Sequence, residues 1–396
     1  MVVDGAEPRT SAEVPFDHRR LDRLLEEEGL DAILITSKHN IQYLLEGYRY
    51  FFYNTMDAHG LSRYLPILVY LRHRPAHTAY VGSPMEVYEE EHGKLRVPTR
   101  RFDTRTSTDA AGAAIAHLRR SGGALPRIGI EPGFMPADAY LMLRDALPTS
   151  ELVNATPALE RLRAVKTAAE LVQLREASDK VVAAMQAVIA AHGEGTTKHQ
   201  FVDALRREEQ DRGLVFDYCL ITMGQNLNRA PSEQAWQTGD VLSLDSGGNQ
   251  NGYIGDLCRM AILGEPDAEL DDLLGEIEAI QQTARRPIRA GTRGGDIYVE
   301  PAAMVRRSRH CDVLDFVAHG MGLVSHEAPW LSDTAPIPYE AYHADRPLEA
   351  GMVLSIETTL RHSRRGYIKL EDTLVVTQDG YDAYGDGARG WNRGRC

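Results

Sequence analysis

Two aspartates eleven residues apart, Asp245 and Asp256, are the first residues in this sequence whose arrangement indicates chemistry. Residues 247–252 between them are dense in turn formers, and apolar runs flank the turn, which predicts a β-hairpin with one aspartate on each arm. Carboxylates are costly to bury, and two of them side by side repel each other at neutral pH unless a cation lies between them. The hairpin therefore predicts a bound metal ion.

Further ligands follow in the second half of the chain. His319 lies in a glycine-rich segment, and Glu357 and Glu371 lie on two apolar, strand-like runs. Each acid alone is more often a salt-bridge partner than a metal ligand, but the joint set offers four carboxylates and one imidazole. This donor set suits Mn²⁺, Fe²⁺, Co²⁺ or Zn²⁺ and exceeds the needs of one ion. We therefore expect two divalent ions per chain, about 3.5–4 Å apart, bridged by carboxylates.

Charge and composition narrow the class of protein. The chain has 396 residues and a formal net charge of −13, which argues against nucleic acid or an anionic membrane surface as its partner. Residues 1–13 are polar and no apolar run is long enough to cross a bilayer, so we expect neither a signal peptide nor a membrane anchor. The four cysteines show no paired spacing, which is typical of reduced thiols in a cytoplasmic protein.

Hydrophobic patterning predicts two domains. Strands and helices alternate through the first part, which predicts an α/β domain with a partly parallel sheet at residues 1–155. A basic stretch around Pro157 marks the boundary. Thr167 and Glu170 then form a capping box, which predicts the start of a long helix. Residues 156–396 segregate their helices and strands, so we expect an α+β domain there.

An unusually aromatic segment lies between the first two predicted strands, at residues 48–64. Aromatic side chains dominate cores and interfaces, so we interpret this segment as part of the core or of a subunit contact. A lid or pocket wall is the alternative.

Several motifs together resemble the "pita-bread" superfamily of metallopeptidases. They are the step from Asp245 to Asp256, the sequence His319-Gly-x-Gly-x-x-x-His326-Glu-x-Pro, and Glu357 followed by Glu371. The most similar branch contains aminopeptidase P, prolidase and creatinase, and the resemblance covers nearly the whole chain. It implies a creatinase-like α/β N-terminal domain, a pita-bread α+β catalytic domain and a homodimer.

The resemblance also implies roles for individual residues. Asp245 would bind one metal ion, Asp256 and Glu371 would bridge both ions, and His319 and Glu357 would complete the shell of the other. The ions would activate a water molecule for attack on the scissile carbonyl. Glu357 would also shuttle the proton of that water. His326 would hydrogen-bond the substrate or the tetrahedral oxyanion, although a purely structural turn histidine is the alternative.

The segment before the hairpin departs from the family pattern. The family carries a further histidine there, whereas this chain has no histidine between His199 and His310. Lys369 also stands where the family often has arginine. We expect Asn226, Arg229 and Tyr253, with His326, to contact the substrate. An arginine in the pocket wall would favour an anionic substrate, although a surface salt bridge would explain Arg229 equally well.

Three functions remain open at this point. The first is a dinuclear metal-dependent hydrolase that cleaves an amide or related C–N bond in a small molecule or short peptide. The second is a metal-dependent lyase on the same scaffold, since the superfamily includes a lyase that acts on dimethylsulfoniopropionate. The third is a non-catalytic binding protein, which the retention of all five ligand positions disfavours.

Overall fold

The computed structural model describes residues 14–54, 60, 63–93, 95–333 and 340–395. The chain forms two compact units, residues 1–163 and 164–396. The expected polar leader, residues 1–13, and part of the aromatic segment, residues 55–59 and 61–62, lie outside the described residues. Among the described helices, none combines the length and the apolar character that a membrane span requires.

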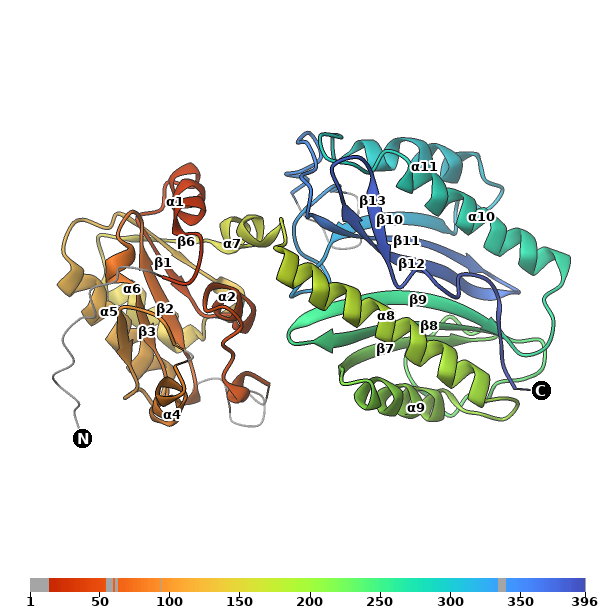
Figure 1. Ribbon diagram of the computed structural model, residues 1–396, viewed down its shortest axis with the longest axis horizontal. Coiled ribbons are helices and arrows are strands. Elements are labelled where there is room, and N and C mark those ends of the chain that lie inside the picture. The colour runs from red at the N-terminus through yellow and green to blue at the C-terminus, as the bar shows by residue number, and fades with distance from the viewer. Residues whose placement is uncertain (1–13, 55–59, 61–62, 94, 334–339, 396) are drawn as a thin grey trace. The chain divides into compact units, whose positions relative to one another are not determined.

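The first unit is built around a six-stranded sheet in the order β4-β3-β2-β1-β5-β6 (Figure 1). The pairs β3·β4, β1·β5 and β5·β6 are parallel and the pairs β1·β2 and β2·β3 are antiparallel, which confirms the predicted mixed sheet. Its elements are α1 (His18–Glu27), β1 (Ala32–Ile35), α2 (Lys38–Leu44), η1 (Phe51–Asn54), β2 (Ile67–Leu71), η3 (Pro75–His77), β3 (Ala79–Val81), η4 (Pro84–Glu86), α4 (Val87–Glu91), β4 (Thr99–Arg101), α5 (Ser107–Ser121), β5 (Arg127–Ile130), η5 (Pro132–Phe134), α6 (Ala137–Ala146), β6 (Glu151–Asn154) and α7 (Thr156–Arg163).

Both faces of this sheet are covered, which explains why β1 is an uninterrupted apolar run. Ile33 and Ile35 pack into a core beneath α1, α2 and α7, and Leu34 packs on the other side against α5 and α6. The predicted domain boundary at residues 155 and 156 falls at the start of α7. This helix packs its leucines into the core of the first unit, so the compact unit extends to the end of α7.

The described part of the aromatic segment lies largely in this core. Tyr48, Tyr50, Tyr53 and Tyr64 are buried, and the hydroxyls of Tyr48 and Tyr80 donate to the buried carboxylate of Glu86 at 2.7 and 2.6 Å. The four tyrosines are therefore core, in line with the first of the two interpretations, whereas Phe51, Asn54, Gly60 and Arg63 are exposed.

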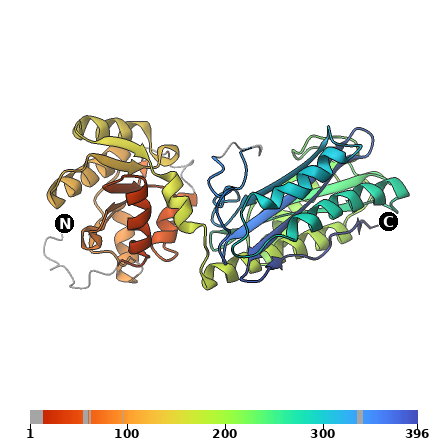
Figure 2. The same ribbon diagram turned by 90° about the horizontal axis from the view of Figure 1, so that it is seen from above.

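The second unit contains a large sheet in the order β10-β11-β12-β9-β8-β7, to which β13 and β14 add at β12 and β9. Figure 2 shows α10 and α11 in front of the blue strands of this sheet. The elements of the unit are α8 (Ala168–Ala191), α9 (Lys198–Asp211), β7 (Val215–Met223), β8 (Val241–Gln250), β9 (Tyr253–Ile262), α10 (Ala268–Arg285), α11 (Asp296–Arg307), β10 (Leu314–Gly320), β11 (Val353–His362), β12 (Gly366–Val376), β13 (Tyr381–Tyr384) and β14 (Asn392–Arg393).

Helices cover one face of this sheet, and strand alternation directs the polar residues to the other face. On β8, Leu242 and Leu244 pack against α8 and α9, so Asp245 projects from the opposite face. On β12, Ile368 and Leu370 pack against α10, so Glu371 also projects from the opposite face. The alternation thus brings acids from distant strands to one surface.

The predicted hairpin is present, but its turn is shorter than the glycine-rich sequence suggested. Strands β8 and β9 pair from Val241 opposite Ile262 to Gln250 opposite Tyr253, and only Asn251 and Gly252 form the turn, both with positive φ. Gly248 and Gly255 lie outside the turn and allow a close approach of helix α8. Gly248 pairs with Gly255 across the hairpin, and helix α8 passes directly over the pair.

The contact between Gly255 and α8 leaves no room for a side chain. A Cβ atom at this position would lie 2.6 Å from the carbonyl carbon of Ala177 and 2.7 Å from the backbone nitrogen of Ser178. We expect Gly255→Ala to lower the free energy of unfolding by about 1–3 kcal/mol, because helix and hairpin must separate. Urea unfolding followed by circular dichroism measures the change.

Gly275→Ala is the matched control, because Gly275 lies in helix α10 with no atom within 4 Å of the added Cβ. Alanine there should raise stability by about 0.5–1 kcal/mol through helix propensity. Equal effects of the two substitutions would contradict the close approach of α8.

A buried acid in α9 predicts a pH dependence of stability. Glu209 accepts the hydroxyl of Ser246 at 2.9 Å, and burial raises its pKa from 4.5 to about 7. Because the folded pKa lies above the unfolded value, stability from this group is complete below about pH 4.5 and is lost as the pH rises through 7. The free energy of unfolding of Glu209→Gln, relative to that of the wild type, should therefore rise by about 2–3 kcal/mol between about pH 5 and pH 8. Parallel urea-unfolding profiles would contradict this assignment.

Candidate metal centre

The five predicted ligands meet on the face of the sheet that the helices leave open. Glu357 on β11 pairs directly with Glu371 on β12, and Glu371 in turn pairs with Cys258 on β9. Cys258 faces Asp245 on β8 and is two residues from Asp256. His319 lies at the end of β10, opposite Ser355. The register of five strands therefore produces the cluster.

The cluster divides into two triads that share Glu371. Ligand atoms of His319, Glu357 and Glu371 lie within 4.8 Å of one another, and so do those of Asp245, Asp256 and Glu371. His319 Nε2 and Asp256 Oδ1 are buried without a hydrogen-bond partner. Buried polar atoms without a partner are unfavourable, and carboxylates with imidazole are suitable donors for divalent transition metals. The residues present therefore fit the expected ions.

Burial and mutual repulsion govern the ionisation of the aspartates. Burial raises the pKa of Asp256 well above its usual range, and the charges of Glu371 and Asp245 raise it further. Burial likewise raises the pKa of Asp245 to about 6, although the ammonium of Lys369 opposes the shift. Both aspartates therefore resist ionisation unless a cation offsets the repulsion between them.

Glu371 and His319 behave in the opposite way. Burial alone would raise the pKa of Glu371, but Lys369 and His319 hold it below its usual range. Burial alone would lower the pKa of His319, but its interactions with Glu371 and Glu357 raise it. Glu371, the ligand shared by the two triads, therefore ionises more readily than Asp245 or Asp256.

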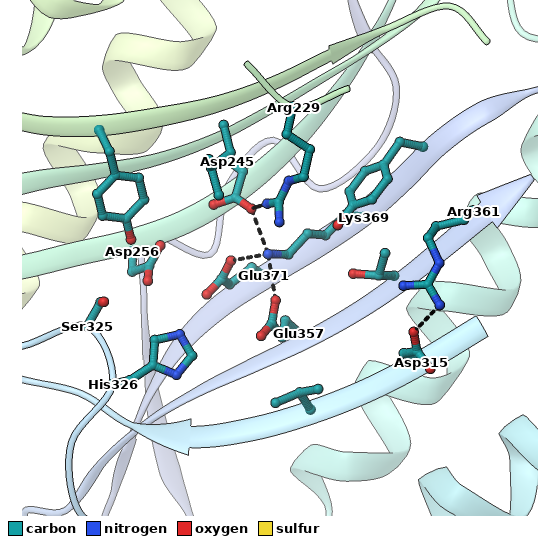
Figure 3. Close-up of a pocket in the computed structure, with 15 residues that line it drawn as sticks. Arg229, Asp245, Asp256, Asp315, Ser325, His326, Glu357, Arg361, Lys369 and Glu371 are labelled. Carbon is teal, nitrogen blue, oxygen red and sulfur yellow. Dashed lines mark hydrogen bonds and ion pairs between the residues drawn. The ribbon is translucent and has the colours of Figure 1, made fainter. Parts of the chain in front are cut away.

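Two basic side chains enter the cluster. The ammonium of Lys369 lies 2.7 Å from Asp245 Oδ2, 2.5 Å from Glu357 Oε2 and 2.8 Å from Glu371 Oε2 (Figure 3). The guanidinium of Arg229 also pairs with Asp245 Oδ2 and stacks over Tyr367 at 5.1 Å from the ring centroid. Arg229 is thus neither a surface ion pair nor a free anion receptor, because its charge is directed at a candidate metal ligand.

A cavity of about 470 Å³ opens onto the carboxylates. His326 lines it and stacks on His319, with ring centroids 3.8 Å apart. Burial and the neighbouring His319 lower the pKa of His326 to about 4, so its ring is neutral near pH 7. The full lining is Tyr218, Leu220, Arg229, Asp245, Asp256, Asp315, Val317, Ser325, His326, Glu357, Thr359, Arg361, Tyr367, Lys369 and Glu371.

Two of the predicted substrate contacts lie outside this cavity lining. The hydroxyl of Tyr253 donates to Glu170 at the start of α8, at 3.0 Å. Asn226 is exposed, and its side chain bonds Gln234 and the backbone of Asn228 within its own loop. Of the four predicted substrate contacts, Arg229 and His326 therefore line the cavity, and Tyr253 and Asn226 do not.

The contacts of Lys369 were not predicted from the sequence, although a usable signal was present. Lys369 precedes Glu371 by two residues on the same strand, and strand periodicity places both on one face. Thr359 and Arg361 follow Glu357 on β11 with the same spacing and also line the cavity. Extending each acidic position along its strand in steps of two residues would have identified all three.

Comparison with known proteins matches both units to families. Residues 172–378 match the model of metallopeptidase family M24, and residues 18–165 match that of the creatinase/prolidase N-terminal domain. The protein named "Probable dipeptidase PepE" of Mycobacterium tuberculosis is 27% identical over 252 residues, which are 62% of this chain and 64% of that protein. The Xaa-Pro dipeptidase of Pyrococcus furiosus is 21% identical over 372 residues, or 91% and 95% of the two chains.

Solved structures share the fold over nearly the whole length. An Xaa-Pro dipeptidase from Bacillus anthracis has a TM-score of 0.79 at 20% identity and covers 95% of this chain and 98% of its own. The dipeptidase PepE from Mycobacterium ulcerans has a TM-score of 0.74 at 23% identity, with 96% and 99% covered.

The shared position of Glu371 predicts how single substitutions affect metal binding. We expect Glu371→Gln to weaken the tightest divalent-ion site by more than about tenfold, since even an outer-shell partner contributes roughly 10–100-fold. Asp256→Asn should affect that site less, because it leaves the triad of His319, Glu357 and Glu371 complete. Isothermal titration with Mn²⁺ measures both, and equal losses would contradict the division into two triads.

Proposed function

Because the chain belongs to metallopeptidase family M24 and is therefore a metal-dependent hydrolase, we propose that it cleaves an amide or related C–N bond of a small molecule or short peptide. The observation that carries the proposal is the pair of triads sharing Glu371 at the floor of a cavity of about 470 Å³. This volume is within the usual range for small-ligand sites. We further propose that the two triads hold two divalent ions of Mn, Fe, Co or Zn.

The chain's own residues have distinct tasks in this reaction. Bound divalent ions would activate water and polarise the scissile carbonyl. Glu357 faces the cavity beside His319, where its carboxylate can accept the proton of the attacking water and pass it to the leaving nitrogen. The neutral ring of His326 donates a hydrogen bond to the substrate or to the oxyanion that develops.

An arginine at the cavity favours a substrate with an anionic group. Arg229 pairs with Asp245, but Arg361 also lines the cavity, and its side chain is 44% exposed and paired at 2.6 Å with Asp315. A guanidinium can bind a carboxylate through two parallel hydrogen bonds. The names of the similar proteins mention dipeptides and Xaa-Pro dipeptides, which supports a short peptide with a free carboxylate as one candidate.

We also propose that the protein is a cytoplasmic homodimer. The free thiols of Cys219, Cys258 and Cys311 support a reducing compartment. The exposed ring of Phe51 within the aromatic segment supports a contact with a second copy. Light scattering coupled to size exclusion tests the oligomeric state.

Metal-loaded protein should hydrolyse members of a panel of Xaa-Pro dipeptides, other dipeptides, cyclic amides, creatine-like amidines and sulfonium acids. On the substrate found, His326→Ala should lower kcat by about 10²–10⁴-fold, because it removes a donor to the oxyanion. Glu357→Gln should abolish turnover.

Reaction in ¹⁸O-labelled water separates hydrolysis from elimination by a lyase. Incorporation of one labelled oxygen into the acyl product is expected for hydrolysis. A product without label would contradict the proposal, and full biological activity of Glu357→Gln would indicate a non-catalytic binding protein.

A further inference from the structure

A buried ion pair lies against the turn that presents His326 to the cavity. Residues 321–327 form this turn after β10, and Ser325 and His326 line the cavity (Figure 3). The next residue, Glu327, is the anion of the pair, and its Oε1 atom lies 3.0 Å from the ammonium of Lys166. Both side chains are only 1% exposed, so water and salt screen the pair little.

The carboxylate of Glu327 connects Lys166 to the middle of the turn. Its Oε1 atom accepts from the ammonium of Lys166, and its Oε2 atom accepts from the backbone N–H of Val324 at 3.3 Å. Gly322 leaves room for this arrangement, because a Cβ atom there would lie 2.8 Å from Cε of Lys166. The residues before His326 are therefore held by a side chain that is not part of the cavity lining.

The lysine and the beginning of the turn are attached to the same part of the sheet. The backbone N–H of Lys166 donates to the carbonyl of Gly351 at 2.9 Å, and that of Met321 donates to the carbonyl of Val353 at 3.2 Å. Both acceptors lie at or just before the start of β11, the strand that carries Glu357. The ion pair therefore fixes the turn relative to a strand of the metal cluster.

We propose that Lys166 is a positioning residue, which acts through Glu327 to hold the turn so that His326 stays within reach of the substrate. The inference rests on the proposed function, because it takes His326 as the donor to the developing oxyanion. It adds a residue outside the cavity on which the rate of the reaction depends.

The energetic reason is the cost of a buried charge. Without Lys166, the carboxylate of Glu327 would lose its cation in a buried position, which is strongly unfavourable. The turn would then shift toward water and take His326 with it. A displacement of about 1 Å in a reacting or binding group can slow a reaction about 10²-fold.

Lys166→Met in the metal-loaded protein should lower kcat about 10–100-fold and change KM by less than about threefold, because His326 acts on a charge that develops in the transition state. The double variant Lys166→Met/Glu327→Gln removes both charges and keeps an amide oxygen that can accept from Val324. It should recover most of the lost kcat.

A double-mutant cycle with His326→Ala separates positioning from a merely structural role. If Lys166 acts through His326, Lys166→Met should lower the kcat of His326→Ala by less than about twofold, whereas independent effects would multiply. Arg161→Met is the matched control. Arg161 is a buried cation of the first unit that pairs with Glu27 and Glu28 at 3.2 and 2.6 Å, so its removal should leave kcat unchanged.

Hydrogen–deuterium exchange provides a readout that does not depend on activity. Amides of residues 321–327 should exchange about tenfold faster in Lys166→Met than in the wild type, and near the wild-type rate in Lys166→Met/Glu327→Gln. The affinity for Mn²⁺ should be unchanged, because the pairing of β10 with β11 holds His319 independently of the ion pair. If Lys166→Met does not fold, Lys166→Gln replaces it in both experiments, with a smaller effect of the same kind.

The outcomes separate the inference from the proposed function. Multiplying effects of Lys166→Met and His326→Ala, or unchanged exchange of residues 321–327, would overturn the inference and leave the hydrolase proposal intact. Failure of the metal-loaded wild type to hydrolyse any member of the substrate panel would overturn both.

Discussion

Four carboxylates share one buried volume, and their mutual repulsion is the constraint on which the rest of the second unit depends. Glu357 and Glu371 are direct partners across β11 and β12, an arrangement in which like charges destabilise a sheet. Asp245 and Asp256 approach the same point from the hairpin. Only cations can keep such a group ionised, and Lys369 supplies one from within the chain. The remaining charge is the driving force for binding divalent metal.

The opposite face of the same strands holds this repulsive cluster in position. Asp372 follows Glu371 and points toward α10, where it is fully buried and pairs with Arg259 at 3.0 Å and with Arg285 at 3.1 Å. Arg259 also donates to the backbone carbonyl of Glu371 at 2.8 Å. Since a buried ion pair is strongly destabilised when either partner is lost, this network resists movement of β12. The position of the shared ligand is thus determined by residues that the substrate does not reach.

Most of the second unit could be predicted from its sequence because strand alternation, capping boxes and turn residues are local signals. The same signals identified the five ligand candidates that the structure brings together. The length of the hairpin turn could not be predicted, because Gly248 and Gly255 are required by the passage of α8 and not by the turn. The hydrogen bond of Tyr253 could not be predicted for a similar reason, since only the tertiary fold brings Glu170 to its hydroxyl. The contacts of Lys369 depend on the register of several strands at once.

The segment before the hairpin is where this chain departs from its family, and the structure gives that departure a physical meaning. An imidazole in this segment can exchange protons near neutral pH, whereas the guanidinium of Arg229 remains charged and only donates hydrogen bonds. The guanidinium of Arg229 forms an ion pair with Asp245 and stacks over the ring of Tyr367. Arg229 therefore contributes positive charge and hydrogen bonds to the cluster, and not an exchangeable proton. In the proposed reaction, Glu357 transfers protons and His326 orients the substrate. The positive charge of Arg229 then influences which substrates bind in the cavity.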